Sequence, residues 1–326
     1  MNPDLRVIAS GLRFPEAPIA LPDGSFLVGD LEPRRVARVS ADGKLSTVAK
    51  IDGAPNGMAI GPDGLCYVAN NGGIAFTDPG DGTVRVARVS RPTDYKGGFI
   101  DRVDPDTGRV ERLYDRADPS PQGDRSDPVL LSAPNDIVFD AAGGFWFTDT
   151  GKGTERESTR GKLCYALTDG SSCIEAAFPM VMPNGIGLSA DEHTLYVAET
   201  ATARIWAFDL AAPGRIRRSD FPSPHGGRLV YASPTYCAFD SLALDGAGNI
   251  CVAAITDGSV MVISPQGQLL DRVAVPDPSP TNVCFGGPDL RTAYITLGQT
   301  GRLVAVPWPR PGLPLNFLNK PRPDTA

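Results

Sequence analysis

Side chains that carry an oxygen recur at one position of a repeated sequence pattern in this chain. Ala54–Ile60 reads APNGMAI, Ala133–Phe139 reads APNDIVF, and Met182–Leu188 reads MPNGIGL. Three further stretches align with these, although an acidic residue replaces the asparagine in two of them. The six equivalent positions are Glu16, Asn56, Asn135, Asn184, Asp240 and Asn282. We call this set the polar ring, because the repeat described below predicts that its members converge.

Turn chemistry explains one copy of Pro-Asn-Gly, since proline fixes φ and Asn-Gly tolerates the left-handed region. We assign the proline and glycine of the motif to such turns. Turn chemistry does not explain Glu16, because glutamate is a poor turn former, or Asp240, which has neither the proline before it nor the glycine after it. What the six positions share is a side-chain oxygen, which favours a common site.

Two converging carboxylates repel each other, and burying them without compensation is costly. A divalent cation relieves both problems, and oxygen ligands from Asp, Glu and Asn suit Ca²⁺, Mg²⁺ or Mn²⁺. No His or Cys occupies a ring position, which argues against the usual kind of zinc site. The ring therefore predicts one bound divalent cation, with Ca²⁺ as the first expectation.

The element that positions the ring is a repeat of two apolar strands joined by a turn. Six copies begin near residues 15, 55, 134, 183, 239 and 281, and a further strand pair follows each of them. A unit of about 40–50 residues with four short strands is typical of a β-propeller blade. The sequence thus predicts an all-β, six-bladed β-propeller with a central metal site, formed by residues 1–326 as a single domain. The first strand of each blade lines the channel, so the six ring residues face one mouth.

Two features of the repeat need separate explanations. The step from Asn56 to Asn135 is much longer than the others, but only one extra hairpin, FIDRVDPDTGRVERLY, is recognisable within it. We interpret it as an enlarged second blade and expect a polar loop around residues 115–132 to overhang the site. The N-terminal DLRVIASG is expected to complete the last blade beside residues 293–308, which would remove exposed strand edges.

Composition limits the class of protein. A formal net charge of −7 disfavours nucleic acid or an anionic membrane as a partner. No apolar run approaches the roughly 18 residues of a membrane span, and the N-terminus lacks the pattern of a signal peptide. The six cysteines form no CxxC pair and are expected to be buried free thiols. These features predict a cytoplasmic protein.

Four longer stretches carry a family resemblance across nearly the whole chain. FPEAP, APNDIVFDAAGGFWFTDT, PNGIGLSADEHTLYVAET and FDSLALDGAGNICVA occur in this order at blade spacing. In this combination the chain resembles the SMP-30/gluconolactonase/LRE family of six-bladed propellers, which includes gluconolactonases, regucalcin and, more distantly, diisopropyl-fluorophosphatase. The resemblance implies metal ligands at Glu16, Asn184 and Asp240. It also implies that Asn135 binds metal or substrate.

The sequence departs from the regucalcin-like branch of that family in two places. Ala133 stands where that branch has a substrate-binding arginine, and Thr150–Gly153 occupies the region of an acidic substrate residue. The FTDT form of Phe147–Thr150 is more similar to bacterial gluconolactonases. These departures leave the sugar-acid substrate open, while the metal ligands are unaffected.

The leading functional hypothesis is a metal-dependent lactonase acting on a small lactone. The cation would polarise the carbonyl oxygen and stabilise the oxyanion, and Asp240 would deprotonate the attacking water in addition to binding the metal. Asn135 would orient the substrate, with Asn56 and Asn282 as further substrate contacts. Hydrolysis of another ester or a phosphotriester at the same site is one alternative. A non-enzymatic, calcium-binding or scaffold propeller is the other.

The remaining polar residues have simpler explanations. His193 lies in the ADEHTLYV turn and is expected to be solvated, and His225 is expected to lie in a surface loop. Asp136 and Asp149 are near the ring in sequence, but both could cap turns. None of the four is assigned a role in catalysis.

Overall fold

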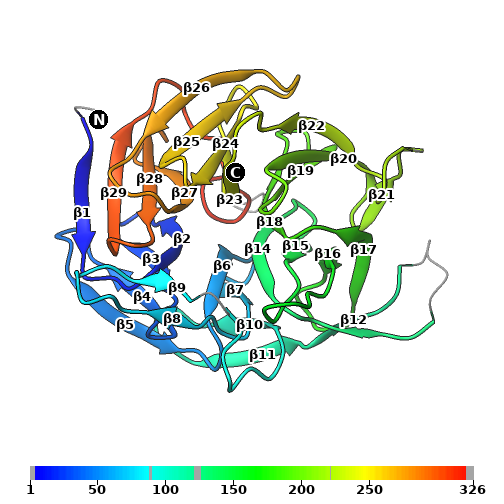
Figure 1. Ribbon diagram of the computed structural model, residues 1–326, viewed down its shortest axis with the longest axis horizontal. Helices are drawn as coiled ribbons and strands as arrows, with labels where there is room; N and C mark the ends of the chain where they lie inside the picture. The colour runs from blue at the N-terminus through cyan, green and yellow to red at the C-terminus, as the bar shows by residue number, and fades with distance from the viewer. Residues whose placement is uncertain (1–3, 88–89, 121–125, 221, 321–326) are drawn as a thin grey trace.

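The structure is a computed structural model that describes residues 4–87, 90–120, 126–220 and 222–320. These residues form six sheets of four or five antiparallel strands around a central axis (Figure 1). The prediction of an all-β, six-bladed propeller is therefore confirmed. The described residues include no helix that is long and apolar enough to cross a membrane.

Each blade runs from an inner strand at the axis to an outer strand at the rim. The first three blades are β2 (Pro15–Ala20), β3 (Phe26–Asp30), β4 (Arg35–Val39) and β5 (Leu45–Lys50); β6 (Pro55–Ile60), β7 (Cys66–Asn70), β10 (Phe99–Val103) and β11 (Val110–Tyr114); and β14 (Pro134–Phe139), β15 (Phe145–Asp149), β16 (Gly161–Ala166) and β17 (Cys173–Met180). Two small pairs lie outside them: β8 (Phe76–Thr77) with β9 (Arg85–Val86), and β12 (Arg116–Ala117) with β13 (Val129–Leu130).

The fourth blade has two short strands on one edge, because both β21 (Arg215–Arg217) and β22 (Arg228–Ala232) pair with β20 (Arg204–Ala212). The last three blades are β18 (Pro183–Leu188), β19 (Thr194–Glu199), β20 (Arg204–Ala212), β21 (Arg215–Arg217) and β22 (Arg228–Ala232); β23 (Ala238–Leu244), β24 (Ile250–Ile255), β25 (Ser259–Ile263) and β26 (Leu269–Ala274); and β27 (Pro280–Gly286), β28 (Thr292–Leu297), β29 (Arg302–Pro307) and β1 (Arg6–Ser10).

Alternation of side chains along each strand explains why the second strands are apolar on both faces. In β15, Phe145 and Phe147 pack toward the second blade, whereas Trp146 between them packs toward the fourth blade. A separate cluster of buried apolar side chains fills each of the six junctions between neighbouring blades. A strand between two blades therefore has to be apolar at successive positions.

The first strand of the chain closes the propeller, as its sequence predicts. β1 pairs with β29 in antiparallel register, from Arg6 opposite Ala305 to Ser10 opposite Arg302. Ala9 of β1 packs with Leu303 in the cluster between the sixth and first blades. Closure removes the free edge of β29 and fixes the circumference of the channel.

The closing strand gives a direct test of this arrangement. Ala9 is 4% exposed and Val7 is 47% exposed on the same strand. We expect Ala9→Asp to lower the free energy of unfolding by roughly 3 kcal/mol or more, because it buries an unpaired charge. Val7→Asp is the matched control and should change it by roughly 0.5 kcal/mol or less. Denaturant unfolding measures both, and equal losses would contradict the closure.

Candidate functional site

All six residues of the polar ring are the second or third residue of an inner strand. They therefore lie at the same mouth of the channel. Each is buried, with exposed fractions between 2% for Glu16 and 6% for Asn135, Asp240 and Asn282. In every blade the pairing of the inner strand with the second strand shifts at or beside the ring residue. Such β-bulges re-aim side chains and are common beside active sites.

The glycine of Pro-Asn-Gly does not serve a turn, and our sequence interpretation of it is wrong. Gly57 and Gly185 lie within strands β6 and β18 and are not among the residues with positive φ. A Cβ atom on Gly57 would lie 2.3 Å from the carbonyl oxygen of Asn135, and one on Gly185 would lie 2.7 Å from that of Asp240. Glycine is needed because the inner strands of neighbouring blades approach each other this closely.

Hydroxyl groups of threonine side chains join neighbouring blades near the ring. Thr148 Oγ1 donates to the carbonyl oxygen of Asn184 at 2.6 Å, linking the third and fourth blades. Thr281 Oγ1 donates to that of Pro15 at 2.7 Å, linking the sixth and first blades. These buried bonds fix the positions of ring residues relative to one another.

Three buried carboxyl groups, those of Glu16, Asp136 and Asp240, lie near one another at the ring, rather than the two that the sequence predicts. Burial raises the pKa of Glu16 well above its usual value, and the charges of Asp240 and Asp136 raise it further. Burial likewise raises the pKa of Asp240 to about 7, and the charge of Asp136 adds to this while a hydrogen bond with Asn184 opposes it. The three groups are close enough for their charges to interact in a site that excludes water.

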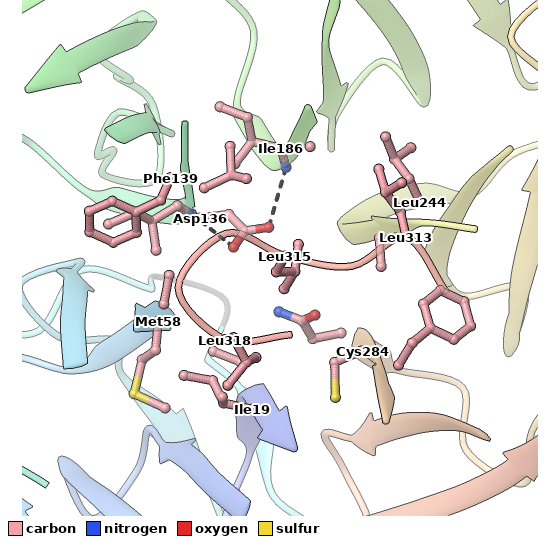
Figure 2. Close-up of a pocket in the computed structure, with 18 of the residues that line it drawn as sticks. Ile19, Met58, Asp136, Phe139, Ile186, Leu244, Cys284, Leu313, Leu315 and Leu318 are labelled. Carbon is pink, nitrogen blue, oxygen red and sulfur yellow. Dashed lines mark hydrogen bonds between the residues drawn. The ribbon is translucent and has the colours of Figure 1, made fainter. Parts of the chain in front are cut away.

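Sequence reasoning missed Asp136, which it treated as a possible turn cap. The carboxylate accepts hydrogen bonds from the backbone N–H groups of Ile137 at 2.9 Å and Ile186 at 3.3 Å, and burial raises its pKa to about 7. Figure 2 shows it directed into the channel. The signal was present in the sequence, because APNDIVF is the only Pro-Asn copy with an acid after the asparagine. Asp149, by contrast, does cap backbone N–H groups and forms an ion pair with Lys162 at 2.8 Å.

The ring asparagines differ in whether their amide oxygens already accept a hydrogen bond. Among the described residues, Asn56 Oδ1 and Asn135 Oδ1 are buried without a hydrogen-bond partner. By contrast, Asn184 Oδ1 accepts from Ser241 Oγ at 3.4 Å, and Asn282 Oδ1 accepts from the N–H of Val283 at 2.7 Å. Buried polar atoms without partners are rare and call for a bound group. Two unpaired oxygens beside clustered carboxylates fit a hard cation.

The part of the chain that the structure describes has no group of three His, Cys, Asp or Glu side chains already arranged to hold a metal. The amide oxygens would thus have to complete any cation site. Asn184 and Asp240 are in contact, as are Asn282 and Glu16. The residues that could hold a cation are therefore Glu16, Asn135, Asn184 and Asp240, with Asn56 and Asn282 beside them.

The channel continues past the ring as an apolar cavity of about 100 Å³. Side chains from all six inner strands line it, and residues 313–319 close its far end (Figure 2). Asn316 fixes this segment by donating from Nδ2 to Phe139 O at 3.0 Å and to Glu192 Oε1 at 2.7 Å. A small molecule therefore approaches the ring from the mouth at which the inner strands begin.

Two sequence expectations outside the ring are wrong. His225 does lie in a loop, between β21 and β22, but it is not at the surface: it is 1% exposed because it packs against Trp206 and Phe208, and burial lowers its pKa. The expected overhang at 115–132 also fails in its described part, since Asp118 bridges Ile174 at the rim. Residues 121–125 lie outside the described residues. The expected exposure of His193 is confirmed.

Comparison with known proteins agrees with this architecture. Residues 14–299 match the family described as the SMP-30/Gluconolactonase/LRE-like region. The chain belongs to this family. It is 27% identical over 311 residues to a gluconolactonase of Zymomonas mobilis, a match that covers 86% of the chain and 76% of that protein. It is 29% identical over 249 residues to a 6-deoxy-6-sulfogluconolactonase of Pseudomonas putida, covering 72% of the chain and 79% of that protein.

A solved structure of the calcium-binding protein regucalcin from Agrobacterium tumefaciens has the same fold as this family member. The two superpose with a TM-score of 0.70 over 97% of each chain, at 17% sequence identity. At this identity the likeness supports the propeller, and the ring residues of this chain have to be argued from their own contacts.

The raised pKa values predict how pH acts on the metal-free protein. A carboxyl group with a raised pKa stays protonated in the folded state after the unfolded state has lost the proton. The contribution of the Asp136 carboxyl group to the free energy of unfolding is therefore fully present below pH 3.8, its unfolded pKa. This contribution is lost as pH rises through the folded pKa of about 7. We expect Asp136→Asn to gain stability relative to wild type between pH 5 and pH 8, in EDTA.

Thermal unfolding at a series of pH values measures this difference. Asp106→Asn, an exposed aspartate on the turn between β10 and β11, is the matched control and should follow the wild-type curve. A difference between Asp136→Asn and wild type that stays constant across this pH range would contradict the raised pKa of Asp136.

Proposed function

We propose that this protein is a divalent-metal-dependent hydrolase that opens a small lactone. The observation that carries the proposal is the polar ring, in which buried carboxylates and two unpaired amide oxygens meet in a closed channel. The names of the two curated relatives, a gluconolactonase and a sulfogluconolactonase, support lactone opening. Family membership and the regucalcin relative described as calcium-binding support Ca²⁺ as the first cation to test.

In this proposal Glu16, Asn135, Asn184 and Asp240 hold the cation. When bound, it supplies Lewis-acid polarisation of the lactone carbonyl and charge to offset the developing oxyanion. Asp240 takes the proton of the attacking water, and its contact with Asn184 fixes the carboxylate for that transfer. Asn135 and Asn56 orient the lactone, because their unpaired amide oxygens can accept hydrogen bonds from substrate hydroxyl groups. Asn282 is a further substrate contact, through its amide N–H groups, because its oxygen already accepts from the N–H of Val283.

A panel of substrates tests the reaction class. We expect the purified protein to hydrolyse aldonolactones, to lose this activity in EDTA, and to regain it with Ca²⁺, Mg²⁺ or Mn²⁺. Colourless lactones can be followed by the acid that ring opening releases. Phosphotriesters and simple esters belong to the same panel, since turnover of these alone would assign a different substrate class. Activity that persists in EDTA would exclude the metal-dependent mechanism, and no turnover would favour a binding protein.

The dual role of Asp240 predicts that two carboxylate variants behave differently. Asp240→Asn should lower kcat roughly 10²–10⁴-fold even at saturating metal, because the amide cannot accept the proton. Glu16→Gln should weaken metal binding, and excess metal should restore most of its kcat. Steady-state kinetics across a metal titration, with Asp106→Asn as control, separates the two. Recovery of Asp240→Asn by metal alone would leave Asp240 as a ligand only.

A further inference from the structure

A segment inserted in the second blade lies on the face of the propeller at which the polar ring is found. This cover segment, residues 71–98, joins β7 to β10, and its residues 88 and 89 lie outside the described residues. It starts beside the ring, because Asn70 at the end of β7 pairs with Pro55, the residue before Asn56. The short strands β8 and β9 lie within it (Figure 1).

The cover segment contacts three other blades on this face. Phe76 packs on Phe14, two residues before Glu16, with ring centroids 5.1 Å apart. The N–H of Val84 donates to Gln299 O of the sixth blade at 3.0 Å. Tyr95 Oη donates to Ser132 O at the entrance of the third blade at 2.6 Å. The segment thus contacts the entrances of the sixth, first and third blades in addition to its own.

Lys152 of the third blade makes two partly buried hydrogen bonds with the cover segment. Its ammonium group donates to Asn71 O at 3.1 Å and to Gly73 O at 2.6 Å, and it lies 5.5 Å from the Tyr95 ring. Burial lowers the pKa of Lys152 to about 8, so the ammonium form still predominates at neutral pH. An ammonium group out of water needs such acceptors, and here backbone carbonyls of the cover segment provide them.

The other ionic contacts of the segment are weaker anchors. Arg34 pairs with Asp94 and Arg13 pairs with Asp78, but both aspartates are more than half exposed. Exposed ion pairs contribute little, typically about 0–1 kcal/mol. Lys152 differs because its contacts are partly buried and reach the first residues of the segment, where it leaves the sheet.

The backbone beside Lys152 is itself tied to the ring. Thr150 donates from its N–H to Ala133 O at 2.9 Å and from Oγ1 to Pro183 O at 3.0 Å. Ala133 is two residues before Asn135, and Pro183 directly precedes Asn184. A short, hydrogen-bonded path therefore joins two ring residues to Lys152 and, through its ammonium group, to the cover segment.

We propose that Lys152 is a positioning residue that latches the cover segment, so that the segment forms one wall of the substrate entrance above the polar ring. This inference rests on the proposed lactonase function for the nature of the substrate. The wall contacts the part of the lactone that does not react, whereas the reacting carbonyl lies at the ring. Loosening the latch therefore weakens substrate binding and leaves the hydrolytic groups in place.

Three variants test the latch in the metal-loaded protein. We expect Lys152→Met to raise KM for the best lactone by roughly tenfold while kcat stays within about twofold. Lys152→Arg keeps the cationic donors and should recover most of the loss. Lys44→Met is the control, because Lys44 is also a lysine but is exposed at a turn between β4 and β5.

Amide hydrogen exchange gives a second measurement that does not depend on turnover. Exchange within residues 71–98 should become faster in Lys152→Met, while the inner strands keep wild-type protection. Unchanged KM, or a fall in kcat at unchanged KM, would overturn the positioning role. Unchanged exchange would overturn the latch itself. If wild type opens no lactone, the proposed function fails and the substrate role fails with it, but exchange still decides whether Lys152 holds the segment.

Discussion

The main constraint on this structure is the burial of three neighbouring carboxyl groups at the mouth of the channel. Glu16, Asp136 and Asp240 come from different blades, and each has a raised pKa because water is excluded around it. Such an arrangement persists only when the surrounding fold holds the groups together against their repulsion. Six interlocked blades provide this, because moving one inner strand outward, such as that of the third blade, would disrupt two apolar junctions.

The position of each ring residue follows from the backbone rather than from side-chain choice. A β-bulge occurs at the ring in every blade, and the glycines of β6 and β18 let neighbouring inner strands approach to van der Waals distance. A larger residue at Gly57 would push the second blade from the third and widen the ring. The close approach of neighbouring inner strands thus sets both the packing around the channel and the spacing of the ring oxygens.

The fold and the polar ring could be predicted from the sequence because both repeat. Six copies of one pattern identify the blades, and a common register identifies Glu16 and Asp240 although neither is an asparagine. Features that occur only once in the chain were harder to predict from the sequence. Asp136 looks like a turn residue until its strand is placed at the axis, and the burial of His225 depends on Trp206 and Phe208, which belong to another part of the blade. The position of the cover segment could not be predicted from the repeat, because the segment occurs in one blade and its contacts with other blades join residues far apart in the sequence.

The two ends of the channel are closed by different physical means, and this difference has a functional consequence. Residues 313–319 fill the far end largely with leucine and phenylalanine side chains, which keeps water from the apolar cavity below the ring. The cover segment at the near end is held by hydrogen bonds to Lys152 and by partly exposed contacts. Apolar burial resists opening more than a few polar contacts near the surface do. For the proposed lactonase we therefore expect any movement that admits a substrate to occur at the near end, while the far end stays closed and the three carboxyl groups keep their raised pKa values.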